Sequence, residues 1–492
     1  MKFVVRSLIA LTLIIALPVV ALAGVLGYSW WQAPIDTVGT VDFQRPLQIP
    51  PLAASRTVDG VRTFELQMQR GTSDLGAGPS TETWGVNGNH LGPTLRATRG
   101  EQVRVDVRNA LGETSTLHWH GMHLPPSMDG GPHQTVAPGA TWSPTWRVDQ
   151  PAASLWYHPH LHGATADHVY RGVAGMFLID EPGGPRLPHD YGVDDIPVIV
   201  QDKKFDGDQL DPDAGFLRST GVHGDRILVN GTPGPYLRVH TERVRLRLLN
   251  ASNARSYKFG FDTGQPFALI GTDGGLLPKP VELQHIQLSP GERAEIVVTV
   301  AAGRNLVLRS ERPELGTDAF AGRFAGGADR FDVLQLRPDA QLRVNAAVPQ
   351  TLSPKPDLGT PTVTRQFTLS GNRVNERKMD MGRVDETVTV DTTEVWEVRN
   401  ADGQPHNFHV HDVQFQVLDT DDPMLSGSKD TVYIPPGQTR RLLMRFEHYT
   451  DAATPYMFHC HLLAHEDDGL MGQFVVVAPG ETARPPHAHP HN

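Results

Sequence analysis

Close to its C-terminal end the chain carries the stretch His459-Cys-His-Leu-Leu-Ala-His-Glu-Asp-Asp-Gly469. Cys460 is the only cysteine among 492 residues, so no intramolecular disulfide can form. On an extended strand, alternate side chains point to opposite faces, so His459 and His461 share one face and Cys460 takes the other. The stretch therefore predicts two metal sites on opposite faces of one strand, linked through the peptide bonds of Cys460.

Several further His-x-His pairs occur in the chain, although its 23 histidines predict only about one such pair by chance. Three of them make eight imidazoles with His459 and His461, paired on common strand faces. Eight ligands would serve three metals as three, three and two, and imidazole suits copper, zinc and iron. The alternative is a set of unrelated surface or core histidines. The other pairs are His118 and His120, His158 and His160, and His409 and His411.

Two more histidines accompany the cysteine. His465 follows Cys460 by five residues, and His406 precedes the pair at His409 by three. One thiolate with two imidazoles is the ligand set of a blue-copper electron-transfer centre. The alternative for Cys460 is a small buried hydrophobic side chain.

Short runs rich in Val, Leu, Thr and aromatic residues, separated by 40 prolines and 48 glycines, predict an all-β protein built of β-sandwiches. Linker-like compositions at 181–188 and 346–361 divide the chain into blocks 40–183, 188–345 and 360–478. The first two His pairs lie in the first block and the last two in the third. Residues 479–492, rich in His and Pro, are expected to form a mobile tail.

The first 27 residues read as a targeting segment. Lys2 and Arg6 precede an apolar run that ends at Ala23, which is typical of a signal peptide, and an uncleaved N-terminal membrane anchor is the alternative. We therefore expect export to the periplasm, the cell exterior or the outer side of the cytoplasmic membrane. The formal net charge of −11, without a basic stripe, argues against nucleic acid as a partner.

The four motifs at 118–121, 158–163, 406–411 and 459–469 resemble the copper signatures of multicopper oxidases, most closely those of three-domain bacterial laccases and copper-efflux cuprous oxidases. The resemblance implies three cupredoxin-like Greek-key domains and four copper ions, with a trinuclear cluster between the first and third domains. His406, Cys460 and His465 match the type 1 ligands, and His118 and His409 match the type 2 pair. The type 3 ligands would be His120, His158 and His461 for one copper and His160, His411 and His459 for the other.

One position departs from the family pattern. Leu470 stands where many bacterial relatives place an axial methionine, with Met471 one residue later. A leucine there cannot coordinate, which would leave a three-coordinate type 1 copper with a raised potential.

Acidic residues at family positions complete the expected site. Asp129 and Glu466 match carboxylates that relay protons for oxygen reduction, with structural roles as the alternative. Asp380 and Asp430 resemble residues near the donor-facing edge of the type 1 copper, with core or loop packing as the alternative.

The predicted function is a laccase-like oxidase that takes electrons from phenols, aromatic amines or low-valent metal ions and reduces dioxygen. Alternatives are a cuprous oxidase for copper tolerance, a copper-free structural relative of the cell envelope, and a two-domain nitrite reductase, which needs fewer histidines and a shorter chain. The chain is expected to act as a monomer.

Overall fold

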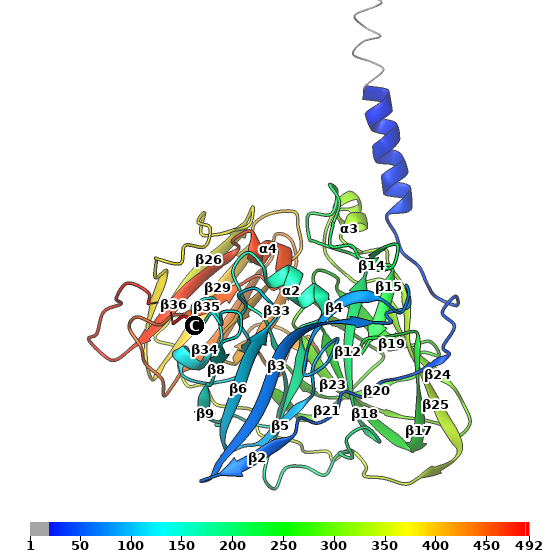
Figure 1. Cartoon of the computed structure of the whole chain (residues 1–492), viewed down its shortest axis with the longest axis horizontal. Helices are drawn as coiled ribbons and strands as arrows, with labels where there is room; N and C mark the ends of the chain where they lie inside the picture. The colour runs from blue at the N-terminus through cyan, green and yellow to red at the C-terminus, as the bar shows by residue number, and fades with distance from the viewer. Residues whose placement is uncertain (1–18, 488, 492) are drawn as a thin grey trace, which may run out of the picture.

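The computed structural model describes residues 19–487 and 489–491, and over these residues the chain folds into three β-sandwiches (Figure 1). The predicted all-β fold class is confirmed. Short helical segments occur only in connections within the described core. They are η1 (Pro126–Met128), α2 (Thr165–Arg171), α3 (Ala319–Phe324), η2 (Pro423–Leu425) and α4 (Leu463–Asp467).

The first sandwich packs a sheet of order β2-β3-β6-β8, with β4 and β9 attached, against a sheet of order β5-β11-β10-β7. Strand β6 alternates buried and more exposed residues along its length, as a strand with one face in the core requires. The strands are β2 (Ser55–Val58), β3 (Val61–Ser73), β4 (Thr81–Val86), β5 (Leu95–Thr98), β6 (Gln102–Ala110), β7 (His118–His120), β8 (Thr141–Trp142), β9 (Thr145–Arg147), β10 (Ala153–His158) and β11 (Gly175–Asp180).

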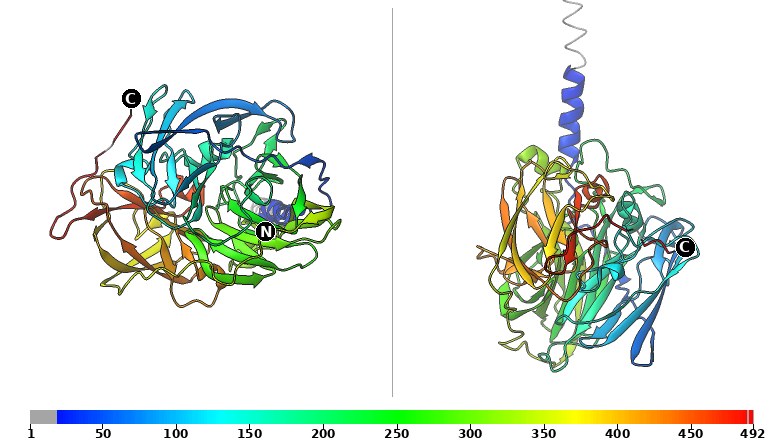
Figure 2. Two further views of the ribbon diagram at one scale, coloured as in Figure 1. Left: turned by 90° about the horizontal axis from the view of Figure 1, so that it is seen from below. Right: turned by 90° about the vertical axis from the view of Figure 1, so that its left-hand side faces the viewer.

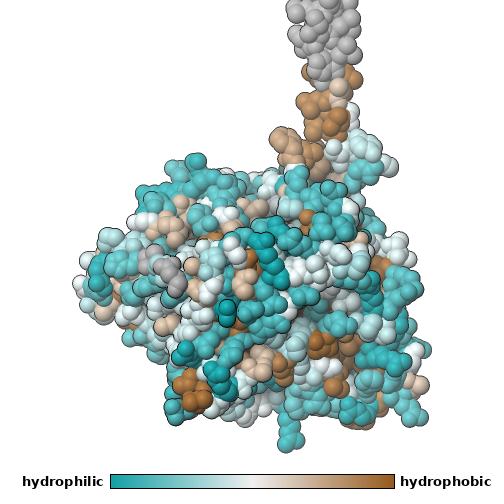
Figure 3. Space-filling view, viewed as in Figure 1, coloured by the Kyte–Doolittle hydropathy of each residue, from teal (hydrophilic) through white to brown (hydrophobic). Residues whose placement is uncertain are grey.

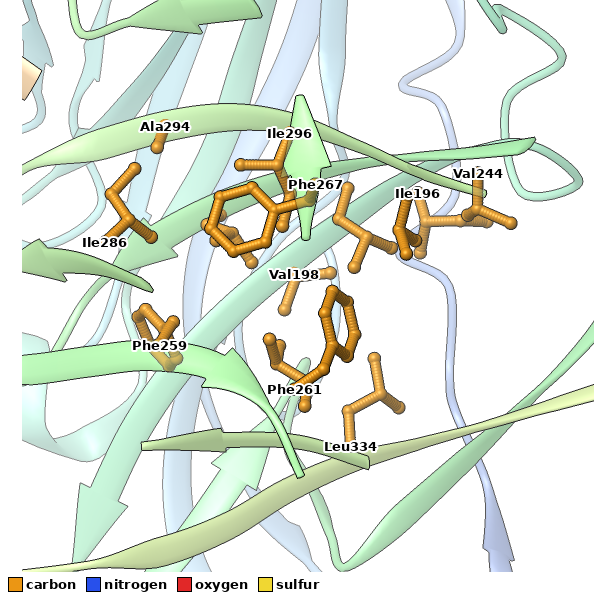
Figure 4. Close-up of a cluster of buried hydrophobic side chains, with 14 of the residues drawn as sticks. Ile196, Val198, Val244, Phe259, Phe261, Phe267, Ile286, Ala294, Ile296 and Leu334 are labelled. Carbon is orange, nitrogen blue, oxygen red and sulfur yellow. The ribbon is translucent and has the colours of Figure 1, made fainter. Parts of the chain in front are cut away.

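The second sandwich packs a sheet of order β16-β15-β12-β18-β23-β20-β21 against one of order β1-β17-β25-β24-β19-β22. Its apolar core includes Phe259, Phe261 and Phe267, which point into the space between the sheets (Figure 4). The strands are β1 (Arg45–Pro46), β12 (Asp195–Lys203), β15 (Arg226–Val229), β16 (Thr232–Pro233), β17 (Pro235–Thr241), β18 (Arg243–Asn250), β19 (Tyr257–Phe261), β20 (Phe267–Thr272), β21 (Gly275–Leu283), β22 (His285–Leu288), β23 (Arg293–Thr299), β24 (Leu306–Glu311) and β25 (Phe331–Arg343). A separate two-stranded sheet is formed by β13 (Phe205–Asp206) and β14 (Gln209–Leu210).

Strand β1 lies inside the predicted first block yet pairs with β17 of the second sandwich. Leu47, next to β1, is buried in the second core, and this burial draws the segment away from the first sandwich. The strands of the first sandwich therefore begin at β2, later than residue 40.

The third sandwich packs a sheet of order β27-β26-β29-β34-β31-β32 against one of order β28-β36-β35-β30-β33. Cys460 and Leu470 belong to its apolar core. The strands are β26 (Val363–Ser370), β27 (Arg373–Val374), β28 (Glu386–Thr389), β29 (Thr392–Asn400), β30 (His406–Val410), β31 (Phe415–Val417), β32 (Ser428–Lys429), β33 (Thr431–Ile434), β34 (Thr439–Phe446), β35 (Tyr456–His459) and β36 (Met471–Val477).

The three sandwiches repeat one topology. Each has a parallel pair in one sheet, formed by β3 with β6, β12 with β18, and β26 with β29. Each has a second parallel pair in the other sheet, formed by β5 with β11, β17 with β25, and β28 with β36. Parallel neighbours need a crossover connection, so this shared pattern marks three copies of one fold.

The N-terminal helix at 19–32 projects from the body (Figure 1) and presents an apolar surface (Figure 3). Its exposed apolar side chains include Val20 and Trp31. Arg323 of α3 donates to the carbonyl oxygen of Trp30 and stacks on its ring, which ties the helix base to the second domain. Within the described residues, no helix is both long and apolar enough to cross a membrane. Residues 1–18 of the predicted targeting segment lie outside the described part.

The C-terminal segment was expected to be mobile, but its described residues run along the body to the first domain (Figure 2). The backbone N–H of His489 donates to His133 O at 2.7 Å, and that of His491 donates to Thr135 O at 2.7 Å. His491 also forms a bridge with Val136. The backbone groups of the segment thus find partners that composition alone did not reveal.

Candidate metal centres between the first and third domains

The four His pairs are carried by strands of the first and third sandwiches that meet at one junction. In the first, β7 and β10 pair with His118 opposite His158. In the third, β30 and β35 pair with His409 opposite His459. All eight imidazoles are at most 1% exposed. Strand pairing and domain docking thus gather side chains that lie more than 300 residues apart.

One group of three histidines, His160, His411 and His459, converges through the Nε2 atoms. His160 Nε2 lies 3.1 Å from His459 Nε2 and 3.2 Å from His411 Nε2. His411 Nε2 and His459 Nε2 are 3.3 Å apart. Three nitrogens at these separations could ligate one ion.

A second group consists of His120, His158 and His461. His158 Nε2 lies 3.4 Å from His120 Nδ1 and 3.4 Å from His461 Nε2. His120 thus turns its Nδ1 toward its neighbours, whereas the other five histidines of the two groups use Nε2. The two groups have the membership that the family resemblance implies for the type 3 ligands.

His118 and His409 are the remaining pair. Their Nδ1 atoms donate to the backbone oxygens of Asp129 at 2.9 Å and Asp430 at 2.8 Å. Both Nε2 atoms are buried and have no hydrogen-bond partner within the described residues. An unpaired buried nitrogen is costly, and a metal ion would relieve that cost. The donor set therefore fits a bound metal.

Protonation states at most of the eight imidazoles favour metal binding as well, whereas at His459 burial lowers the pKa but Glu466 raises it above the ordinary value. Burial, followed by the neighbouring imidazoles, holds the pKa values of His120, His158, His409 and His411 well below the ordinary value. Burial lowers the pKa of His461 to about 3. Neutral imidazoles keep a lone pair free, which a metal ligand requires.

The cysteine site lies on the other face of the same stretch. Cys460 Sγ is 3.6 Å from His406 Nδ1 and 3.7 Å from His465 Nδ1, and these two nitrogens are 3.1 Å apart. Burial opposes ionisation, but the two imidazoles lower the pKa of Cys460 to about 6. Burial also opposes protonation of His406, whose pKa Asp402 and Cys460 raise to about 9. The three side chains could ligate one ion.

The comparisons with known proteins agree on one family. Models described as multicopper oxidase match residues 67–184, 201–321 and 349–480. The multicopper oxidase mco of Staphylococcus haemolyticus is 34% identical over 87% of this chain and 91% of its own length. The chain belongs to the multicopper oxidase family. Membership implies copper binding and dioxygen as electron acceptor.

Two further relatives show how broad this family is. A laccase-like multicopper oxidase from Ochrobactrum sp. is 32% identical, with a TM-score of 0.78 over 88% of this chain and all of the other. The cell division protein FtsP of Escherichia coli is 37% identical over 88% of this chain and 93% of its own length. Overall identity therefore does not choose between an oxidase and a cell-division protein.

Two carboxylates support the group formed by His160, His411 and His459. Asp129 Oδ2 accepts from His411 Nδ1 at 2.8 Å. Glu466 lies between His459 Nδ1 at 3.1 Å and His160 Nδ1 at 3.4 Å. Burial opposes ionisation of Glu466, but His160 and His459 hold its pKa well below the ordinary value. The two acids predicted from the sequence thus face all three imidazoles of one multicopper oxidase metal position.

Asp430 was expected near the donor-facing edge of the type 1 copper, and this prediction is wrong. Its Oδ1 accepts from His120 Nε2 at 3.0 Å, inside the histidine cluster. Arg293 of the second domain donates to both Asp430 oxygens at 2.6 Å. Arg293 also donates to the backbone oxygen of Ser154 in the first domain. This fully buried guanidinium thus joins all three domains beside the cluster.

At the position expected for an axial ligand, Leu470 is fully buried in the core that contains Cys460. The backbone N–H of Cys460 donates to Leu470 O at 3.1 Å, which sets the two residues opposite each other. Met471 instead pairs with His459 and lines a cavity with Val374 and Arg383. Opposed residues share a sheet face, so Leu470 lies on the face of Cys460, whereas Met471 lies on that of His459.

The outer edge of the cysteine site contains residues that sequence reasoning missed. Asp402 accepts from His406 Nε2 at 3.1 Å, and the backbone oxygen of Ser219 accepts from His465 Nε2 at 3.1 Å. Asn407 Oδ1 accepts from the His461 backbone N–H at 2.5 Å and lies 3.5 Å from Cys460 Sγ. Asn407 could have been found from the sequence because it lies inside the motif at 406–411. For Ser219, which lies in the second domain, no sequence pattern pointed to the site.

Proposed function

We propose that this multicopper oxidase takes single electrons from small donors at the Cys460 site and reduces dioxygen to water at the histidine cluster. The observation that carries the proposal is the convergence of eleven buried ligand atoms on two adjoining sites, where the Nε2 atoms of His118 and His409 have no partner in the described part of the chain. A copper-free structural protein would gain nothing from buried imidazole nitrogens without partners, because each one lowers stability unless a metal binds it.

In this proposal the chain holds four copper ions. His406, Cys460 and His465 ligate the type 1 copper, and His118 and His409 the type 2 copper. One type 3 copper is held by His120, His158 and His461, and the other by His160, His411 and His459. When bound, copper supplies the one-electron redox chemistry that no side chain of this site provides.

The chain provides the electron route between the two sites. His459 and His461 are bonded to Cys460 through one peptide link on each side. Asn407 stiffens this link, because it accepts from the His461 N–H and donates to Pro290 O of the second domain at 2.8 Å. Fixed geometry lowers the reorganisation needed when charge moves.

Protons for water formation are assigned to Asp129 and Glu466. Both carboxylates are buried and contact imidazoles of the cluster, so they could deliver protons to it through those side chains or a water molecule. Among the described residues, Asp129 Oδ1 is buried without a hydrogen-bond partner, so this oxygen is free to contact a water molecule at the cluster.

Leu470 offers no ligand atom, so His406, Cys460 and His465 would hold the type 1 copper without a thioether. Loss of an axial thioether raises the potential of such a site. Redox titration of the blue band should give a potential above that of methionine-ligated relatives. Spectroscopic evidence of thioether ligation would reassign the position to Met471.

The donor is proposed to be a phenol or aromatic amine, as in laccases. Similarity to the Ochrobactrum enzyme, described as having oxidase activity towards lignin model compounds, supports this choice. Oxidation of Cu(I) for copper tolerance is the alternative within the family. Export through the N-terminal segment fits either donor, and the exposed apolar helix at 19–32 is consistent with an anchor on the outer side of the membrane.

The test is oxygen uptake by copper-loaded protein with a phenol and, separately, with Cu(I), each with and without added Cu(II). Cys460→Ser protein serves as the matched control. Uptake with phenol alone supports the laccase-like assignment, and uptake with phenol only after added Cu(II) supports the cuprous oxidase. A protein with no blue band and no uptake with any donor would instead be a copper-free relative, as the similarity to FtsP allows.

A further inference from the structure

Two histidines that are not among the eleven proposed copper ligands contact each other at the junction of the first and third domains. His123 Nε2 lies 3.0 Å from His448 Nδ1. This spacing is close to the 3.1 Å between His160 Nε2 and His459 Nε2 in the cluster. Nitrogens that share one tetrahedral ion at about 2.0–2.1 Å lie roughly 3.3 Å apart, so only a small movement would admit a metal.

Asp412 prepares His123 for such a role. Its Oδ1 accepts from His123 Nδ1 at 2.8 Å, which fixes the tautomer and turns the lone pair of Nε2 toward His448. A carboxylate behind a histidine in this way is the usual support of a metal ligand. Across the described chain, Asp412 has no Lys or Arg within ion-pair distance, so a cation at His123 would compensate its buried charge.

The site is built from strained backbone and opens to solvent. Asp412 and His448 both have left-handed backbone conformations, with φ of 70° and 67°, which are unfavourable for residues other than glycine. His123, Asp412 and His448 line a cavity of about 410 Å³ that also has Asp149 and Glu447 in its wall. Asp149 forms an ion pair with Arg99, and Glu447 forms one with Arg445, so neither carboxylate is free to bind a metal. Water from the cavity would therefore complete the coordination of the ion.

We propose that His123 and His448 form an additional binding site for a divalent transition-metal ion such as Zn²⁺ or Cu²⁺. Imidazole favours these ions over Mg²⁺ and Ca²⁺. The ion would join the first domain, through His123, to the third, through His448. The site is independent of the donor oxidised by the enzyme and of the copper ions proposed above.

The experiment is calorimetric titration of the copper-loaded enzyme with Zn²⁺, with copper content and the blue band measured before and after. The wild type should bind one Zn²⁺ that His448→Ala protein loses or binds at least tenfold more weakly. His448 is exposed, so the variant should fold. His189→Ala is the matched control, since His189 is also exposed and faces an aspartate, and it should bind Zn²⁺ like the wild type.

A second measurement uses the domain junction. Zn²⁺ should raise the melting temperature of the wild type and of His189→Ala, because a ligand that binds only the folded state stabilises it, and should not raise that of His448→Ala. His123→Gln should behave like His448→Ala. Equal Zn²⁺ affinity and stoichiometry in wild type and His448→Ala, or no binding by the wild type, would overturn the proposal. If Zn²⁺ bound only at the histidines of the C-terminal tail, the wild type and His448→Ala would bind it with equal affinity and stoichiometry.

Discussion

The Cys460 site and the histidine cluster share one stretch of chain but are assembled in different ways. All three side chains of the Cys460 site come from the third domain, between residues 406 and 465. The eight imidazoles of the cluster come half from the first domain and half from the third, and Arg293 of the second domain braces them. The first site therefore depends on one sandwich, whereas the second depends on the docking of three.

Cys460→Ser should have the largest effect, because it removes the sulfur of one site and leaves all eight imidazoles of the other. We expect loss of the blue charge-transfer band and a fall in donor oxidation of at least about 10³-fold, since the electron entry site is gone. Copper analysis should show that the cluster still fills. Retained donor oxidation would show that electrons enter elsewhere.

Arg293→Ala should have the opposite selectivity: it should impair the histidine cluster and leave the Cys460 site intact. It leaves the buried Asp430 carboxylate unpaired, which should cost about 3–5 kcal/mol of unfolding free energy. We expect reduced copper at the cluster but a preserved blue band, measured by calorimetry, copper analysis and absorption. Arg96→Ala, at a partly exposed ion pair with Asp180, is the control and should cost no more than about 1 kcal/mol. Equal loss of both sites would refute independent assembly.

Glu466→Gln should slow only the reaction at the cluster. Stopped-flow measurements should show reoxidation by dioxygen slower by about 10²-fold, with anaerobic reduction of the blue centre unchanged, because a general acid is lost but no ligand is. Asp468→Asn is the matched control, as its carboxylate faces Lys378 at the surface. Unchanged reoxidation at every pH would leave Glu466 a purely structural role.

Asp402→Asn should have the smallest effect, confined to the Cys460 site. In metal-free protein, ultraviolet absorption should show the Cys460 thiolate forming with a pKa of about 6. The substitution removes the carboxylate that stabilises the protonated form of His406, and protonated His406 stabilises the Cys460 thiolate. The midpoint of thiolate formation should therefore rise by up to about one pH unit. The properties of the cluster should not change. A midpoint that stays in place would mean that Asp402 does not act on the pair.

Cys460 and His406 together should make the stability of the metal-free protein depend on pH. The thiolate contribution of Cys460 is complete above the pKa in the unfolded chain and is lost as the pH falls through about 6. The His406 contribution is complete below its unfolded pKa and is lost as the pH rises through about 9. Thermal unfolding should therefore show the stabilisation by this pair between those two pH values, and a wild type that matches Cys460→Ser throughout that range would contradict it.

The sequence by itself determined the chemistry of both sites. Ligand types and their i, i+2 spacing follow from strand geometry, so the four His pairs and Cys460 could be read without a structure. The all-β fold followed from short β-rich runs between prolines and glycines. Grouping the histidines into triplets needed the family resemblance, because strand geometry does not say which pairs meet.

Only the tertiary structure decided what surrounds the ligands. Arg293 reaches Asp430 from 137 residues away, and His123 reaches His448 from 325 residues away, with no local pattern to announce either contact. Asp430 was misplaced from the sequence because its role depends on which domain faces it. Local geometry repeats along a chain and can be recognised there, whereas contacts across domain junctions arise from docking and appear only when the domains are assembled.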